Sequence, residues 1–515
     1  MNEIARANGA SPPGLRETAG AFLRRHWFIL LLLFWVLHVV SRHLLDTRCF
    51  YEDVAHLLAQ SLALVDTGRF QYEGNYIYRN LTLGPFAPLL AGIPLWLTRD
   101  IHAQYYFLSV LQFLAVLVFY VGARRLVPAG NGKFIATLVF AQALSYNYAS
   151  IYPDNENFLP FFLALFFYFL ILCLKRKTYA FLLVWVSLGL CLQLHFTTVL
   201  LVPAVIVAIR PWSRPRDLAM TVAGLLLIAV SQYHLVEQVS FCLVQFGADL
   251  YSPAAAGGHR FLASYCRAFA IWALAAPLKM GPAGSCFAVL AVVDRRRIAA
   301  RAPEFLPLLN GALVHLGLCA VFLPVFFSLK YGILMFYFFA FAIFVASLSG
   351  YYFLPEPVRA APQPGRSAMS KALLVFCGVF LLGQVACFAT DLNFDRGYFF
   401  DPPINQQLVI AARINKLITE QGLPTVGIDD RVYDDDDHGR LQLVSQTDYT
   451  YRVLCQYVFP QLRSRFTSAP SYRLEVLVRP KRGAPLPADA SSALAAWTKV
   501  DEFEVGRRLI EIYLK

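Results

Sequence analysis

The feature that most constrains this chain is that its cationic clusters and its carboxylates occupy alternate gaps between long apolar runs. The cationic gaps hold Arg24-Arg25, Arg124-Arg125, Lys175-Arg176-Lys177, Arg210 with Arg214 and Arg216, Arg295-Arg296-Arg297, and Arg359 with Arg366. The gaps between them hold Glu52, Asp53, Asp154 and Glu156. Because cationic loops of membrane proteins stay in the cytoplasm, the pattern predicts a polytopic membrane protein with those acids on its outer side.

The composition agrees with a membrane protein. Of the 515 residues, 58% are hydrophobic and only 15% are charged, and the mean hydropathy is +0.52. The net charge of +12 lies mostly in short loops, where it fixes topology and faces anionic lipid headgroups. We therefore expect membrane lipids, and no nucleic acid, as partners.

We predict about eleven transmembrane helices, with the amino terminus cytoplasmic and the carboxyl terminus outside. The spans are 27–44, 104–124, 133–150, 157–174, 178–195, 196–210, 217–235, 278–293, 303–325, 331–350 and 371–389. Residues 1–26 then form a cytoplasmic tail, 27–390 the transmembrane domain, and 391–515 an outer domain. This outer domain is polar, and strand patterns near Thr425–Ile428, Arg473–Val478 and Arg508–Leu514 predict an α/β fold.

The first outer loop, 46–101, contains an amphipathic pattern. Its apolar positions follow helical spacing: Val54, Leu57, Leu58, Ser61, Leu62 and Val65. We predict a helix lying on the outer membrane surface with Glu52 and Asp53 at its amino end, where the helix dipole favours ionised carboxylates. The proline-broken stretch from Pro85 to Trp96 predicts a second surface helix.

The outer acids are the strongest candidates for chemistry. Glu52 and Asp53 are adjacent at the membrane interface, where such a pair can act as general base and charge stabiliser or bind a divalent cation. Asp154 and Glu156 follow a span on the same side, and they can complete an acidic cleft. The alternative is that all four are solvated acids that cap helix ends.

Outer basic residues oppose the topological trend and indicate a phosphate ligand. They are Arg260, Arg267, Lys279 and Lys330, and Arg and Lys are the usual partners of phosphate. Lys330-Tyr331 opens a late span, whereas simple snorkelling is the alternative for each cation. His195, after Gln193, is polar at membrane depth and is predicted to face a cavity or partner. The chain contains no Walker A, GxSxG, HExxH or GxGxxG motif, so we expect a donor drawn from the bilayer.

Several segments together resemble the GT-C glycosyltransferases, a superfamily that includes protein O-mannosyltransferases, aminoarabinose transferases and rhizobial galacturonic acid transferases. The matching segments are Phe50 to Leu62, Thr67-Gly68-Arg69-Phe70, Gly84-Pro85-Phe86-Ala87-Pro88-Leu89, Tyr152-Pro153-Asp154-Asn155-Glu156, Gln193 to Thr197, and Lys330-Tyr331. Two features depart from the family pattern. Glu52 precedes Asp53 where the family has Asp before Glu, and the proline segment lacks its usual histidine.

The resemblance implies a bacterial inner-membrane enzyme with a periplasmic site and carboxyl-terminal domain. Such an enzyme takes a sugar from a polyprenyl-phosphate donor and transfers it, with inversion, to a lipid-linked or cell-envelope glycan acceptor such as lipopolysaccharide. Asp53 or Glu52 would be the base, with Asp154 or Glu156 in support. Lys330 with Tyr331, the other outer cations and His195 would bind the lipid phosphate. A divalent metal is known in some members, and this sequence leaves it open.

Two other functions remain as alternatives. A transporter or lipid flippase predicts internal repeats or acids buried in mid-span. A non-catalytic envelope assembly subunit predicts that the acids of the first outer loop are dispensable.

Overall fold

The computed structural model describes the chain in segments. They are residues 52–68, 76–78, 81–128, 132–146, 153–233, 286–287, 289–327, 343–351, 375, 379, 402, 404–435, 441–447, 450–466, 470–481, 486–506 and 508–515. The predicted spans 27–44 and 371–389 lie wholly or almost wholly outside these segments.

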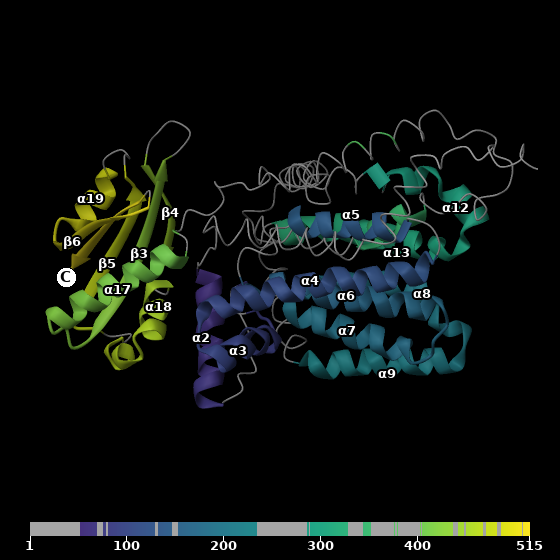
Figure 1. Ribbon diagram of the computed structural model, residues 1–515, viewed down its shortest axis with the longest axis horizontal. Coiled ribbons are helices and arrows are strands. Elements are labelled where there is room, and N and C mark those ends of the chain that lie inside the picture. The colour runs from purple at the N-terminus through teal and green to yellow at the C-terminus, as the bar shows by residue number, and fades with distance from the viewer. Residues whose placement is uncertain are drawn as a thin grey trace, which may run out of the picture.

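A bundle of apolar helices makes up most of the described chain. Its longer members are α4 (Ile101–Leu126), α5 (Gly132–Tyr146), α6 (Asn155–Leu174), α7 (Ala180–Leu194), α9 (Pro215–Ser231) and α13 (Leu306–Phe327). The shorter ones are η2 (Phe196–Leu200), α8 (Leu201–Ile209), η3 (Pro211–Ser213), α12 (Arg295–Arg301) and η5 (Pro303–Phe305). Helices α4, α6, α7 and α9 follow one another side by side (Figure 1).

Within the described segments, three helical stretches are long and apolar enough to cross a membrane. They are Ile101–Leu126, Asn155–Leu174 and Phe196–Ser213. The first two match the predicted spans 104–124 and 157–174 closely. The third combines η2, α8 and η3, so the chain turns from a tight 3-10 helix into an α-helix where the sequence predicted one regular span.

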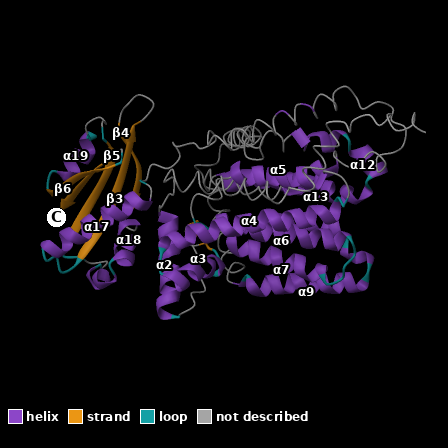
Figure 2. Cartoon of the chain, in the orientation of Figure 1, coloured by secondary structure: helices purple, strands orange, loops and turns teal. Residues whose placement is uncertain are grey.

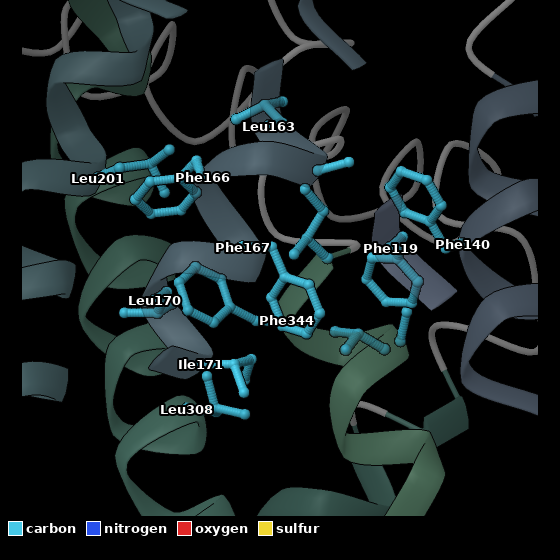
Figure 3. Packing of buried hydrophobic residues seen from close by; sticks show 14 of the residues in the cluster. Phe119, Phe140, Leu163, Phe166, Phe167, Leu170, Ile171, Leu201, Leu308 and Phe344 are labelled. Atoms are coloured by element: carbon cyan, nitrogen blue, oxygen red, sulfur yellow. The ribbon is translucent and has the colours of Figure 1, made fainter. Parts of the chain in front are cut away.

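Aromatic packing holds the middle of the bundle together. The ring of Phe119 on α4 stacks on Phe140 of α5 at 4.3 Å and on Phe167 of α6 at 4.6 Å between centroids (Figure 3). At Gly122, an added Cβ would lie 3.1 Å from the Phe167 ring, so the absence of a side chain lets α4 approach α6. Because lipid is as apolar as these side chains, such close contacts rather than water exclusion associate helices in a membrane.

Three cationic clusters meet at one end of this bundle. The Lys175 ammonium donates a hydrogen bond to the carbonyl of Arg125. The Arg176 guanidinium donates to the Ile209 carbonyl at 3.2 Å and to Ser213 Oγ at 2.8 Å. Cations at the carboxyl ends of helices are favoured by the helix dipole. The alternation seen in the sequence is therefore a real difference between the two ends of the bundle.

Two helices cross the opposite end of the bundle. They are α2 (Glu52–Thr67) and α3 (Phe86–Thr98), which follow the two helices predicted for the first outer loop. A short hairpin of β1 (Tyr76–Tyr78) and β2 (Leu81–Thr82) lies between them in sequence.

The sequence placed the apolar face of α2 on the membrane surface, and the structure differs. Val54, Leu58 and Leu62 are each at most 7% exposed and belong to a hydrophobic cluster shared with the carboxyl-terminal domain. Protein rather than lipid covers this face, because α2 lies between α3 and that domain (Figure 1). In contrast, Trp96 and Leu97 on α3 are 70% and 69% exposed, as expected of a helix that touches the bilayer surface.

The carboxyl-terminal domain is a mixed five-stranded sheet covered by helices (Figure 2). Its strand order is β4-β3-β5-β7-β6, and only β3 and β5 run parallel. The strands are β3 (Val426–Asp435), β4 (Leu441–Thr447), β5 (Tyr472–Pro480), β6 (Thr498–Val505) and β7 (Arg508–Leu514). The helices are α17 (Ile404–Glu420), α18 (Thr450–Val458), η7 (Pro460–Arg465) and α19 (Ala488–Leu494). In β7, Ile510 and Ile512 are fully buried, but Glu511 on the other face is also only 3% exposed, so the strand is covered on both faces where the sequence predicted a half-buried strand.

Candidate functional site

The structure describes some of the predicted site residues and omits others. Side chains are described for Asp53, Asp154, Glu156 and His195. Glu52 is the first residue of α2, with its side chain outside the description. Apart from His195, the residues predicted to bind the phosphate also lie outside the described segments: Arg260, Arg267, Lys279, Lys330 and Tyr331.

Glu156 and His195 come together from neighbouring helices. Glu156 is in the first turn of α6, and His195 follows the last residue of α7. Glu156 Oε1 lies 3.6 Å from His195 Nε2. The imidazole is 1% exposed, whereas 27% of the Glu156 side chain is exposed. The carboxylate can therefore reach a substrate while the histidine orients it from behind.

The backbone turn at His195 fixes the ring. His195 is in an extended conformation between α7 and η2, with φ −157° and ψ 115°. Thr197 Oγ1 is 2.5 Å from Nδ1, and Thr198 Oγ1 donates to the His195 carbonyl at 2.9 Å. Nδ1 and the Thr197 hydroxyl form a hydrogen bond whose direction depends on the tautomer of the ring, whereas Glu156 lies beyond hydrogen-bond distance of Nε2. Thr197 is a site residue to which the sequence assigned no role.

Asp154 has a structural partner of its own. It is the N-cap of α6 and is 4% exposed. Its Oδ1 accepts a hydrogen bond from the backbone N–H of Asn155 at 2.6 Å. Capping acids satisfy free N–H groups and benefit from the helix dipole. This geometry is the helix-capping alternative that the sequence left open for this residue.

Helix α3 and the residues just before it contact both α2 and the end of α7. Asp53 lies in the first turn of α2 and is half-buried. Farther along α2, Ser61 Oγ donates to the carbonyl of Pro88 on α3 at 3.1 Å. Just before α3, Gly84 packs so closely on Gln193 that an added Cβ would lie 3.0 Å from its side chain. Gln193 is two residues before His195, so the proline segment bridges the first outer loop and the end of α7.

The described residues do not form a complete metal site. Among them, no three His, Cys, Asp or Glu side chains gather closely enough to hold an ion. Glu156 and His195 supply two ligand groups, and the Asp154 carboxylate is occupied in capping α6. We therefore derive no step through a metal.

Comparison with solved structures identifies the fold. The crystal structure of ArnT from Cupriavidus metallidurans bound to undecaprenyl phosphate aligns with a TM-score of 0.52 at 16% sequence identity, covering 94% of this chain and 98% of that one. Its apo state aligns with a TM-score of 0.53 at 13% identity, covering 95% and 98%. The archaeal oligosaccharyltransferase AglB from Archaeoglobus fulgidus gives a TM-score of 0.43 at 13% identity over 77% and 58% of the chains, too weak a likeness to bear on the fold.

No protein-family profile matches this chain, and no curated protein matches it in sequence. The likeness to ArnT nevertheless extends over nearly the whole length of both chains. It includes the apolar helices and the small carboxyl-terminal sheet domain. The chain therefore has a GT-C-type fold, that of a polytopic α-helical membrane protein with a carboxyl-terminal α/β domain.

Proposed function

We propose that this protein is a glycosyltransferase that moves a sugar from a polyprenyl-phosphate donor to a lipid-linked or cell-envelope glycan. The observation that carries the proposal is the contact between Glu156 and His195 at the bundle end opposite the cationic clusters. It lies in a fold shared with ArnT, whose crystal structure contains undecaprenyl phosphate. The GT-C resemblance of the sequence implies the acceptor class, a lipid-linked or cell-envelope glycan.

The first-loop acids are proposed to supply the base. Asp53 or Glu52 removes the proton of an acceptor hydroxyl as its oxygen attacks the anomeric carbon of the donor sugar. The bond from that carbon to the phosphate oxygen breaks, and its electron pair leaves with the polyprenyl phosphate. Attack from the face opposite the phosphate inverts the configuration. Both acids lie at the amino end of α2, where the dipole favours the ionised form that a base requires.

The supporting roles divide between two groups. We assign the support of the base or the sugar to Glu156, oriented by His195, rather than to Asp154, whose carboxylate caps α6. We assign the lipid phosphate to Lys330 and Tyr331, aided by further outer cations: Arg260, Arg267 and Lys279. Charge-assisted contacts of this kind stabilise a phosphate as it becomes the leaving group.

The proposed location follows the charge of the bundle ends. The cationic end faces the cytoplasm and the Glu156–His195 end faces the periplasm of a bacterial inner membrane. The carboxyl-terminal domain is then periplasmic, next to α2. We also propose a divalent cation at the outer acids. Adding EDTA to the assay tests this proposal, because activity that survives chelation would contradict it.

Sugar transfer in membranes supplied with radiolabelled polyprenyl-phosphate sugars tests the function. We compare the wild type with Asp53→Asn and Glu52→Gln, and use Glu420→Gln as a control. Glu420 is an exposed acid on α17 that pairs with Lys416. The proposal predicts that one of the two first-loop variants loses roughly 10²- to 10⁴-fold in rate, with the control unchanged and all proteins present in the membrane.

Other outcomes point elsewhere. If both first-loop variants keep wild-type activity, neither Asp53 nor Glu52 is the base, and Glu156 becomes the candidate for that role. If the wild type transfers no sugar from any donor, the proposed glycosyltransferase activity is contradicted. A transport or envelope-assembly role would then replace it.

A further inference from the structure

An ion-pair network joins the far end of α2 to the carboxyl-terminal domain. Asp66, one residue before the end of α2, pairs with the guanidinium of Arg99. Its second oxygen, Oδ2, lies 2.8 Å from Nη1 of Arg463 in η7. The Arg463 Nε in turn donates to the carbonyl of Gln456 at 3.0 Å. One carboxylate therefore connects α2, the end of α3 and the carboxyl-terminal domain.

A tyrosine closes the same junction from the domain side. The hydroxyl of Tyr457 on α18 donates to the carbonyl of Arg99 and accepts from the N–H of Ile101, both at 2.6 Å. These two backbone groups flank the turn between α3 and α4. Burial is the largest influence on this phenol, and it raises the pKa of Tyr457 to about 12. The hydroxyl therefore stays protonated and keeps both bonds at any physiological pH.

Arg99 holds a backbone conformation that its residue type disfavours. It caps α3 in the left-handed region, with φ 57° and ψ 20°. Glycine usually occupies this position, and a residue with a Cβ costs about 1 kcal/mol there. The side chain offsets this cost by its contact with Asp66.

An apolar seam runs along the side of α2 that faces the domain. Val54, Leu58 and Leu62 share one buried cluster with Tyr451 and Leu454 of α18. Helix α2 contacts α18 directly, as the neighbouring positions of α2 and the domain in Figure 1 illustrate. The helix that carries Glu52 and Asp53 is therefore held along its length by the domain and at its end by the ion pairs.

We infer that the carboxyl-terminal domain positions helix α2 for sugar transfer, through Asp66, Arg99, Arg463 and Tyr457. The inference rests on the proposed function, because it concerns the acids on α2. These four residues are positioning residues: they lie at the far end of α2 from Glu52 and Asp53 and act by fixing the helix. Loosening the contact misplaces the base without removing it, so turnover falls while the donor binds as before.

Kinetics of the full-length protein in lipid nanodiscs test this inference. The variants are Asp66→Asn, Arg463→Gln and their double variant. We expect kcat to fall by up to roughly fivefold, the rate equivalent of what exposed ion pairs contribute, with KM for the lipid donor within about twofold. The double variant should be no slower than Asp66→Asn alone, because that variant already loses the Arg463 contact. Arg463→Lys keeps the charge and should recover most of the rate.

Arg413→Gln is a matched control. The Arg413–Asp501 pair has a 2.9 Å contact and side-chain exposures of 45% and 21%, against 2.8 Å, 42% and 24% for Arg463 and Asp66. Both members belong to the carboxyl-terminal domain, so this variant removes an equivalent ion pair without touching α2. We expect no change in kcat.

Hydrogen exchange of the α2 amides is a second readout that does not need activity. Exchange should rise in Asp66→Asn and Arg463→Gln and remain at the wild-type level in Arg413→Gln. Unchanged kcat and unchanged α2 exchange in both variants would overturn the inference, as would an equal effect of the control. If α2 exchange rises but the wild type transfers no sugar, the hold on α2 is supported and the proposed function fails.

Discussion

Glu156 Oε1 lies 3.6 Å from His195 Nε2, and Thr197 Oγ1 lies 2.5 Å from Nδ1 of the same ring. One nitrogen of this buried imidazole thus faces a partly exposed acid, and the other contacts a hydroxyl. The hydrogen bond with Thr197 holds the ring, and Glu156 lies beside its other nitrogen.

Glu156→Gln should lower sugar transfer roughly 10²-fold, because the amide removes the charge that supports the reaction. Thr197→Val should lower it less, about fivefold, because it removes one hydrogen bond that only orients the histidine. Steady-state transfer rates of the purified variants measure both effects. An equal loss in the two variants would show that the site collapses rather than loses a specific group.

Gly84→Ala should reduce both stability and transfer. The new Cβ would lie 3.0 Å from the Gln193 side chain, and such overpacking costs about 1–3 kcal/mol. Thermal unfolding in detergent and the transfer rate measure the effect. The double variant Gly84→Ala with Gln193→Ala should recover much of the loss, since the side chain that clashes is gone.

Gly317→Ala is the control for that experiment. Gly317 lies within α13, and an added Cβ would meet nothing within 4 Å. In a helix interior alanine is more favourable than glycine by up to about 1 kcal/mol, so this variant should be neutral or stabilising. A similar loss in both glycine variants would contradict the steric explanation.

The ion pairs of Asp66 should persist into acidic conditions. Burial tends to raise the pKa of this carboxyl, but the hydrogen bonds and charges of Arg99 and Arg463 outweigh it and lower the pKa below the ordinary 3.8. A carboxyl whose pKa is lowered by folding stabilises the folded state at pH values above its ordinary pKa. This contribution is lost as the pH falls through the folded-state pKa.

We therefore expect the wild type to unfold at a higher temperature than Asp66→Asn from neutral pH down to about pH 5. The difference should shrink only as the pH falls below the ordinary pKa of 3.8. Thermal unfolding across this pH range measures it. A difference that disappears already near neutral pH would show that another group is responsible.

Arg431→Ala should destabilise the carboxyl-terminal domain severely. Arg431 Nε lies 2.7 Å from Oε1 of Glu475, which is 2% exposed on the central strand β5. Burial raises the pKa of Glu475, and Arg431 opposes that rise. Removing the arginine leaves an uncompensated buried carboxylate, at a cost of about 3–5 kcal/mol.

Arg473→Ala is the comparison for Arg431→Ala. The Arg473 side chain is 59% exposed and lies 3.7 Å from Asp429 on the same sheet. Loss of such an exposed pair should change the free energy of unfolding by no more than about 0.5 kcal/mol. Denaturant unfolding monitored in the carboxyl-terminal domain distinguishes the two variants, and equal effects would contradict the role given to burial.

The membrane fold could be predicted from the sequence for clear physical reasons. His195 and Glu156 could each be singled out, but their contact could not. Apolar runs and the positions of their charges identify the helices and the two ends of the bundle. His195 drew attention because a polar residue at membrane depth needs a partner. That partner, Glu156, was predicted as an outer acid, but no pattern in the sequence around either residue predicts that the two meet.

Other features depend on contacts distant in sequence. Helical spacing identified the apolar stripe of α2 but not what covers it, and protein rather than lipid does so. Arg463 is 397 residues from Asp66, and no pattern in either segment connects them. Capping by Asp154 was foreseeable as an alternative, since an acid before an apolar run is a typical helix start.

The most direct test of the central claim is transfer by the purified, reconstituted protein. It would be supplied with polyprenyl-phosphate sugars carrying label in the sugar and with cell-envelope glycolipid as acceptor. A glycosyltransferase should give labelled glycolipid together with an equal amount of released polyprenyl phosphate, and Glu156→Gln should give little of either. Release of neither product by the wild type, with any donor, would contradict the claim that this protein is a glycosyltransferase.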